Sequence, residues 1–170
     1  MLRLYILRHA KASLASPGMR DFDRTLSGRG MEDARHVAAI MREQGYVPQV
    51  IACSPSVRTR MTLDGVRVAF GDNKPETVFD PSLYHGGSEE YLAAMGGFDG
   101  ATSGMIIGHN PYCEIVASTL CGGGDTHSVK ILKQKFPTGA LAVFDMDLDA
   151  WGEVKPGCAD LADFIIPKEL

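Results

Sequence analysis

The chain has 170 residues, a formal net charge of −4 at pH 7 and an apolar content of 45%. This length and composition suit a proper hydrophobic core, so we expect residues 1–170 to form a single domain. No apolar run is long enough to span a membrane, and neither a basic stripe nor an aromatic stacking motif indicates nucleic acid. We therefore expect neither a membrane nor a nucleic acid as partner.

The N-terminus and the cysteines bear on the compartment. The first residues lack a basic region followed by a long apolar stretch and a cleavage site, so they do not resemble a secretory signal. The four cysteines are widely spaced and form no pair with metal-ligand spacing. We expect reduced thiols, a cytoplasmic location, and neither a metal nor a cofactor.

Apolar runs and helix-capping signals alternate along the chain. We expect strands at 2–7, 47–53, 76–79, 104–107, 140–146 and 152–155, helices at 28–44, 55–70, 88–95 and 111–120, and a flexible break at 122–124. Helix 28–44 should begin after the N-cap Ser27, end before Gly45 and bury a stripe of Met31, Ala34, Ala38 and Met41. The alternation predicts a three-layer α/β/α fold, with a mostly parallel central sheet and helices on both faces.

The first strand ends on Arg8-His9-Ala10. The carboxyl end of a strand is where α/β proteins bind ligands. The planar fork of an arginine suits phosphate, and a neutral imidazole can attack phosphorus directly. Taken alone, the tripeptide is also compatible with a hydrogen-bonded turn.

Two later strands end in the same way. Ser54-Pro55 follows the second apolar run and reads as an N-cap and first helical position, which places Arg58 about one turn into a helix. Asn110-Pro111 repeats the pattern after strand 104–107, with His109 between the strand and the helix N-terminus, where anions are favoured. Parallel neighbouring strands would bring these groups into one pocket for a dianion such as phosphate, whereas the alternative is three unrelated capped helices.

These motifs, in this order, resemble the signature of the histidine phosphatase superfamily, also called phosphoglycerate mutase-like. The signature runs Arg-His-Gly after a strand, then Ser-Pro-x-x-Arg opening a helix, then a second His after a strand. The resemblance extends from about residue 2 to about residue 147, and Ala10 departs from the usual Gly. Short length, the Arg-His-Ala-Lys opening and the segment at 24–30 are similar to the SixA-type phosphohistidine phosphatase branch, which has no large cap insertion.

The resemblance implies a metal-independent phosphatase with a covalent phosphohistidine intermediate on His9. Arg8 and Arg58 would clamp the phosphoryl oxygens and stabilise charge in the transition state. A protonated His109 would donate to the same oxygens, and Asn110 would complete the substrate site.

Two interpretations are open for the proton donor of the leaving group. Mutase-like relatives place a Glu in a Leu-x-Glu pattern after a short third strand, and His85 stands at the matching position here. Either His85 replaces that acid or it is a surface loop residue. Lys11, Arg20 and Arg24 could steer an acidic phosphoprotein, although a solvated loop is the favoured interpretation.

The missing carboxylic acid favours phosphohistidine as substrate, because an imidazole leaving group needs a proton donor less than an alkoxide does. The expected partner is therefore a phosphorylated protein that carries phosphohistidine, and the alternative is a small phosphate ester. A non-catalytic phosphate-binding module is a different class of function, disfavoured because both His9 and His109 are present.

Overall fold

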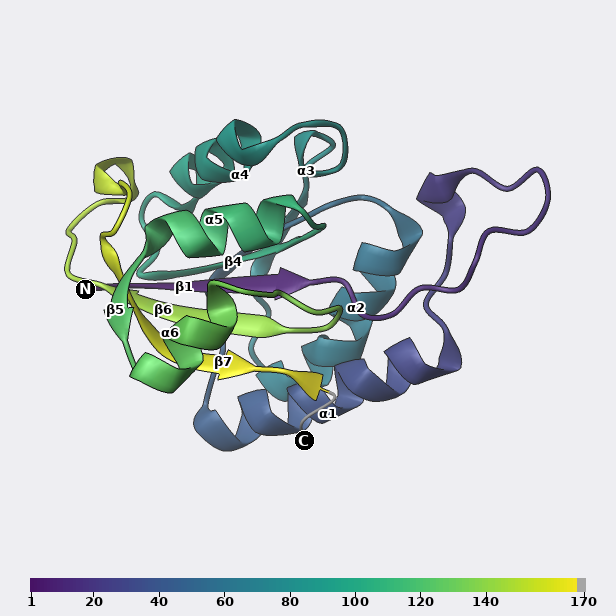
Figure 1. Cartoon of the computed structure of the whole chain (residues 1–170), viewed down its shortest axis with the longest axis horizontal. Coiled ribbons are helices and arrows are strands. Elements are labelled where there is room, and N and C mark those ends of the chain that lie inside the picture. The colour runs from purple at the N-terminus through teal and green to yellow at the C-terminus, as the bar shows by residue number, and fades with distance from the viewer. Residues whose placement is uncertain (168–170) are drawn as a thin grey trace.

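The computed structural model describes residues 1–167, and its centre is a seven-stranded sheet (Figure 1). The strands are β1 (Leu2–Arg8), β2 (Val50–Cys53), β3 (Glu76–Phe79), β4 (Ser103–Gly108), β5 (Cys121–Gly124), β6 (Leu141–Met146) and β7 (Ala159–Ile165). The α-helices are α1 (Gly28–Gln44), α2 (Val57–Arg67), α3 (Ser82–His85), α4 (Ser88–Ala94), α5 (Tyr112–Leu120) and α6 (Thr126–Leu132). Short 3₁₀ turns are η1 (Asp21–Asp23), η2 (Val68–Phe70), η3 (Met95–Phe98) and η4 (Trp151–Glu153).

The strand order is β3-β2-β4-β1-β6-β7-β5. The first four of these strands run parallel to one another, whereas β6 is antiparallel to both of its neighbours, and β7 and β5 are parallel. This confirms the expected mostly parallel sheet. It also places the carboxyl ends of β1, β2 and β4 at one edge, with β4 between the other two.

Helices cover both faces of the sheet, and the alternation of side chains along β1 shows how. Leu4 and Ile6 pack in a core with residues of α4, α5 and α6, whereas Tyr5 and Leu7 pack in a core with residues of α1 and α2. Successive side chains of a strand point to opposite faces, so β1 is buried on both sides. The strand that leads to His9 is therefore held from both faces.

Helix α1 has the bounds expected from the sequence. The side chain of Ser27 accepts a hydrogen bond from the N–H of Gly30 at 3.0 Å, and Gly45 ends the helix at φ 71°, a conformation that favours glycine. The predicted apolar stripe was wrong at Met31, which is 41% exposed, and it omitted the fully buried Val37. The inward position in the first turn belongs to Gly30, where a Cβ would lie 2.1 Å from the carbonyl oxygen of Lys11.

The C-terminal third departs further from the sequence expectation. The expected strand at 152–155 is wrong, because 151–153 forms η4 and the last strand is β7. The expected flexible break at 122–124 is wrong as well, because these glycines belong to β5. A Cβ on Gly122 would lie 2.1 Å from the carbonyl oxygen of Gly157, so glycine here permits close approach of two backbones. Helices α3 and α6 were not expected; α6 begins at an N-cap, Asp125, that accepts from the N–H of Ser128.

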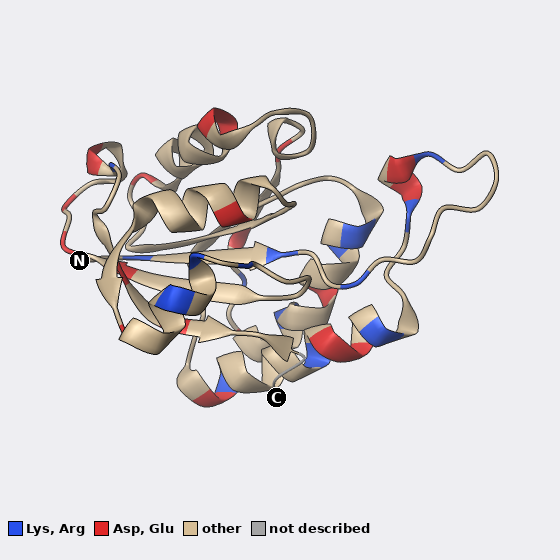
Figure 2. Cartoon of the chain, in the orientation of Figure 1, with Lys and Arg blue, Asp and Glu red and all other residues tan. Residues whose placement is uncertain are grey.

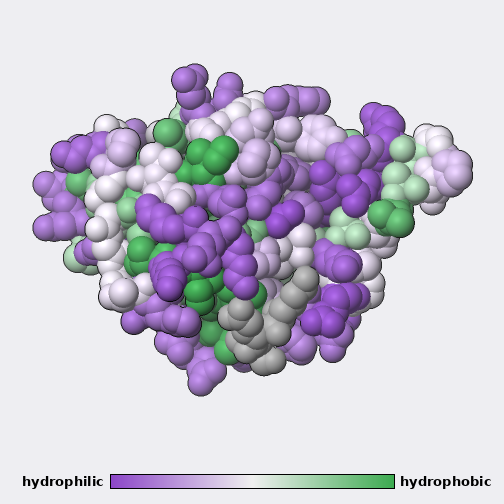
Figure 3. All heavy atoms as spheres, viewed as in Figure 1, coloured by the Kyte–Doolittle hydropathy of each residue, from purple (hydrophilic) through white to green (hydrophobic). Residues whose placement is uncertain are grey.

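The segment between β1 and α1 projects from the body of the molecule (Figure 1). A bridge between Ala12 and Leu26 closes its base, and η1 carries the acidic Asp21 and Asp23 between the flanking Arg20 and Arg24 (Figure 2). Most of the face shown in Figure 3 is hydrophilic, with small separate apolar patches. Within residues 1–167, no helix combines the length and apolar character needed to cross a bilayer.

Candidate active site

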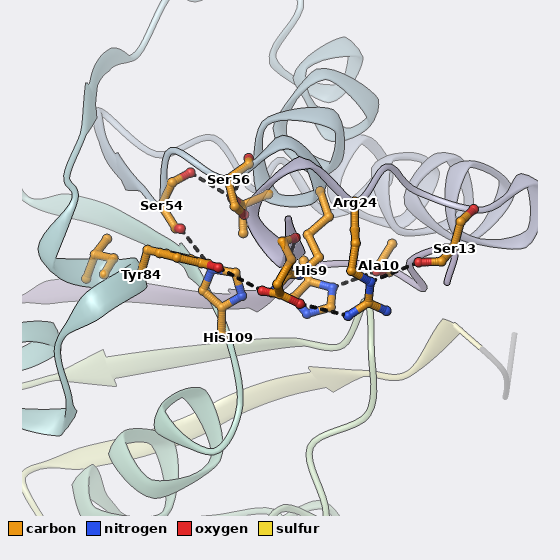
Figure 4. A network of polar contacts seen from close by, with 12 residues as sticks. His9, Ala10, Ser13, Arg24, Ser54, Ser56, Tyr84 and His109 are labelled. Atoms are coloured by element: carbon orange, nitrogen blue, oxygen red, sulfur yellow. Dashed lines mark hydrogen bonds and ion pairs between the residues drawn. The ribbon is translucent and has the colours of Figure 1, made fainter. Parts of the chain in front are cut away.

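Two imidazoles meet where β1 and β4 end. The strands pair in parallel, with Arg8 opposite Gly108, and the N–H of His9 donates to the carbonyl of Gly108 at 3.0 Å. The next residues along the two strands, His9 and His109, have ring centroids 5.3 Å apart. The expectation that these strands are parallel neighbours is thus met, and Figure 4 shows both rings at this edge of the sheet.

The geometry around His9 defines its tautomer. Its Nδ1 lies 2.7 Å from the carbonyl oxygen of Ala10, which can only accept, so Nδ1 carries the proton and donates. Nε2 is then left with its lone pair. Burial lowers the pKa of His9 to about 4, against the effect of the Ala10 bond and with the help of the nearby Arg58 and Arg8 guanidiniums. The ring, 9% exposed, is therefore a neutral imidazole with a free Nε2 at neutral pH.

His109 is held from two directions. Its backbone N–H donates to the hydroxyl of Tyr91 at 2.9 Å, and its Nε2 lies 2.8 Å from Oγ of Ser54. Burial, together with His9 and the positive charge of Arg58, lowers the pKa of His109 to about 3. His109 is therefore neutral in the free protein, whereas the sequence interpretation had considered it as a protonated donor.

The guanidiniums of Arg58, Arg8 and Arg24 approach His9 closely enough to lower its pKa. Arg58 is 7% exposed and donates from Nη1 and Nη2 to the backbone carbonyl and the carboxylate of Asp21, at 2.8 and 3.0 Å. Arg8 donates from Nη1 to the carbonyl of Phe136 at 2.8 Å. The Nε groups of Arg8 and Arg58 are buried and have no hydrogen-bond partner among the described residues. These two N–H groups therefore lack the partner that buried polar groups normally have.

Helices α2 and α5 begin slightly later than predicted. Ser54 is not the N-cap of α2, which begins at Val57, because the Ser54 hydroxyl instead contacts His109. Similarly, α5 begins at Tyr112 rather than at Pro111. Arg58 nevertheless lies in the first turn of α2, as expected.

Asn110 lies beside Arg8, because its Nδ2 donates to the carbonyl of Phe136 that also accepts from Arg8, at 3.0 Å. Its Oδ1 accepts from the N–H of Glu114 at 3.2 Å. His85 is farther out: it is exposed and its ring packs edge-on against Tyr84, which packs edge-on against His109. The structure thus connects His85 to the site through the ring of Tyr84.

Sequence reasoning missed three residues of this site, namely Asp21, Arg24 and Tyr84. The Asp21 carboxylate accepts from Arg24, Arg58 and the Tyr84 hydroxyl at 3.1, 3.0 and 2.8 Å. Tyr84, His109, His9 and Arg24 lie in a row in Figure 4. Arg24 was expected to be a solvated loop residue, but its Nε also donates to the carbonyl of Ser13, which fixes it beside the site.

Among residues 1–167, no group of three or more His, Cys, Asp and Glu side chains is arranged to hold a metal ion. The positive groups at the site are guanidiniums. The arrangement offers an unprotonated nitrogen nucleophile, a second imidazole and unpaired N–H donors, which is a set suited to phosphoryl transfer.

The chain resembles known proteins over its whole length. No protein-family model matches it. It is 34% identical to a protein of Agrobacterium tumefaciens provisionally named phosphohistidine phosphatase SixA, with a TM-score of 0.82 and 98% of each chain covered. A protein histidine phosphatase SixA solved with tungstate shares the fold at 22% identity, with a TM-score of 0.78 and 99% of each chain covered.

A further relative, an uncharacterised protein of Mycobacterium tuberculosis, is 29% identical and covers 95% of this chain and 100% of its own length. The Agrobacterium protein shares enough sequence over enough of its length to establish the family. The chain belongs to the histidine phosphatase superfamily and is a SixA-like phosphatase.

Proposed function

We propose that the protein hydrolyses phosphohistidine in a partner protein through a covalent intermediate on Nε2 of His9. The observation that carries the proposal is the orientation of His9: its Nδ1–H donates to Ala10, and its free Nε2 lies near Arg58 and Arg8, whose Nε groups are buried and have no partner among the described residues. A neutral, oriented imidazole beside cationic donors is what nucleophilic attack on a phosphoryl group requires.

In the first step, Nε2 of His9 forms a bond to phosphorus while the bond from phosphorus to the leaving nitrogen breaks. Arg8 and Arg58 hold the non-bridging oxygens and stabilise the charge that develops on them. The bond from Nδ1 to the Ala10 carbonyl stabilises the positive charge that the ring acquires. His9 thus needs no separate base, because its Nε2 is already unprotonated.

His109 changes its role when the phosphoryl group binds. In the free protein its pKa is about 3, so it is neutral. A dianion beside the ring favours the imidazolium form, since an opposite charge raises the pKa of an imidazole. The protonated ring then donates to a phosphoryl oxygen. In the second step water attacks phosphorus, the bond to Nε2 breaks, and phosphate leaves.

Two observations support phosphohistidine as the substrate. The protein of 34% identity carries the name of a phosphohistidine phosphatase. The carboxyl group found at the site, Asp21, has a pKa of about 2 and is ionised at neutral pH, so it does not supply a proton to an alkoxide. An imidazole leaving group needs a proton donor less than an alkoxide does. A cytoplasmic location remains a prediction and agrees with the four free cysteines.

A substrate panel tests the proposal. Phosphohistidine peptide, aryl phosphate, phosphoserine peptide and glycerol phosphate are compared by kcat/KM. We expect phosphohistidine and aryl phosphate to exceed the two alkyl phosphates by roughly 10²–10⁴-fold, the usual contribution of a general acid. Equal or faster turnover of alkyl phosphates would move the protein to small phosphate esters. Stoichiometric phosphate binding without any turnover would identify a binding module.

A further inference from the structure

Asp21 occupies the hydrogen-bonding groups of Arg58 in the free protein. Nη1 of Arg58 donates to the Asp21 backbone carbonyl, and Nη2 donates to Oδ2 of the same residue. The carboxylate is also bound by Arg24 and by the hydroxyl of Tyr84. The Asp21 carboxylate therefore binds Arg58, the arginine that holds the phosphoryl group in the proposed function.

The two partners of this ion pair are anchored very differently. The side chain of Arg58 is 8% exposed and extends from α2, which packs against the sheet, whereas the side chain of Asp21 is 53% exposed. Asp21 belongs to η1 on the projecting segment between β1 and α1 (Figure 1). When the pair separates, Asp21 is therefore the partner that can move, while Arg58 keeps its place beside His9.

A phosphoryl dianion and the Asp21 carboxylate cannot both use Arg58 without strong repulsion. Like charges that share one guanidinium lie within a few ångströms of each other, where their repulsion is only partly screened by solvent. The incoming group must therefore displace the carboxylate. Arg24 and Tyr84, which already hold it, offer it contacts away from Arg58.

We propose that Asp21 is an internal anion that competes with the phosphoryl group for Arg58 and so weakens the binding of phosphate dianions. The inference rests on the proposed function, in which Arg58 binds the phosphoryl group. The competition lowers affinity for substrate, and it also helps product phosphate to leave, because the carboxylate returns to Arg58 as phosphate departs.

The Asp21 carboxylate stays ionised at the pH values at which phosphatases are assayed. Partial burial raises the pKa of Asp21, but hydrogen bonds from Tyr84, Arg24 and Arg58 outweigh it and hold the pKa at about 2. Ordinary changes of pH therefore do not remove the competition, and a substitution is needed to test it.

The substitution Asp21→Asn removes the charge and keeps an oxygen that can accept from Tyr84 and Arg58. Inorganic phosphate and tungstate are titrated into the protein by calorimetry and used as competitive inhibitors of aryl phosphate hydrolysis. We expect both dissociation constants to fall by at least about tenfold, and KM for aryl phosphate to fall with them. A dissociation constant that rises shows instead that Asp21 positions Arg58, and an unchanged constant shows that no competition exists.

Asp23→Asn is the matched control, because Asp23 lies on the same turn but pairs with the exposed Arg20. Its phosphate affinity should equal that of the wild type. Arg58→Ala separates this inference from the proposed function. If Arg58→Ala leaves phosphate affinity unchanged, the phosphoryl site itself is misplaced. If it abolishes binding while Asp21→Asn has no effect, only the competition is refuted.

Discussion

The hydroxyl of Tyr91 accepts a hydrogen bond from the backbone N–H of His109 at 2.9 Å. It also donates to the carbonyl of Leu83 at 2.9 Å, and the side chain is fully buried on α4. A Cβ on Gly108 would lie 2.4 Å from this hydroxyl, so glycine there allows the approach. A helix residue outside the reacting groups thus determines where the second imidazole lies.

The substitution Tyr91→Phe should destabilise the protein and reduce its activity. It leaves the N–H of His109 and the carbonyl of Leu83 buried without their partner, which costs about 1–3 kcal/mol of the free energy of unfolding. Urea denaturation and kcat/KM measure the two effects. Tyr112→Phe on α5 is the control and should change the free energy of unfolding by less than about 0.5 kcal/mol. Equal stability of the two variants would show that the Tyr91 hydroxyl has no such role.

The substitution His9→Ala should abolish turnover without unfolding the protein. Loss of the nucleophile should lower kcat by at least about a thousandfold. Rapid-quench labelling of the wild type should find acid-labile, base-stable phosphate on His9. His36→Ala, an exposed position on α1, serves as control and should be fully active. Substantial activity in His9→Ala would refute the nucleophile assignment.

The pH dependence of the reaction should report the lowered pKa of His9. Burial and nearby arginines bring that pKa to about 4 from 6.5, so Nε2 stays unprotonated well below neutral pH. We expect kcat/KM for aryl phosphate, corrected for ionisation of the substrate, to fall only as pH drops through about 4. This quantity reports the free enzyme. A fall centred near 6.5 would mean that His9 has an ordinary pKa.

The burial of a neutral His9 should also make stability depend on pH. The unfolded imidazole binds a proton below pH 6.5 and the folded one only below about 4, so the contribution to stability is complete above 6.5 and is lost as pH falls to 4. Urea denaturation over this range compares the wild type with His9→Ala. The variant should show a weaker dependence.

A chelator should leave the rate unchanged. Guanidiniums already provide the charge stabilisation that a divalent ion supplies in metal-dependent phosphatases. The measurement is the rate of aryl phosphate hydrolysis before and after prolonged treatment with EDTA. A rate that collapses and returns with magnesium would contradict the site as described.

The substitution His85→Ala tests whether His85 donates a proton. The ring is exposed and contacts Tyr84, so we expect the ratio of rates for phosphohistidine and phosphoserine peptides to stay unchanged. A ratio that widens, with loss confined to alkyl phosphates, would identify His85 as the donor. Measuring kcat for both substrates separates this effect from a change in binding.

The sequence was sufficient to place those residues of the candidate site that follow strands directly. Arg8, His9 and His109 stand at strand ends, and Arg58 follows one, so local apolar patterns locate all four. Asp21 contacts Arg58 across 37 positions of the chain from an irregular segment that has no periodicity to read. Tertiary contacts alone bring it to the site, as they do Tyr84.

The predicted strands are wrong where glycine and polar residues form the observed strands, namely β5 and β7. Gly122 and its neighbours have low intrinsic strand propensity, yet β5 forms because it pairs in parallel with β7, and the absence of a side chain on Gly122 permits close approach to Gly157. β7 alternates buried and exposed residues only over 159–162, and the exposed Asp160 and half-buried Asp163 interrupt its apolar sequence, so no continuous apolar run marks it. By contrast, α1 was predicted with its bounds because its capping residues act locally.

The pairing of β1 with β4 has a consequence for when the protein becomes active. Leu7 pairs with Ile107, one hundred positions later in the chain, and the two imidazoles meet only through this pairing. Closing so long a loop has a large entropic cost that only the completed core offsets. A nascent chain or a truncated fragment that ends before β4 therefore contains His9 but lacks His109. Phosphatase activity is then a direct report of the fully folded protein, which makes it a sensitive assay for refolding.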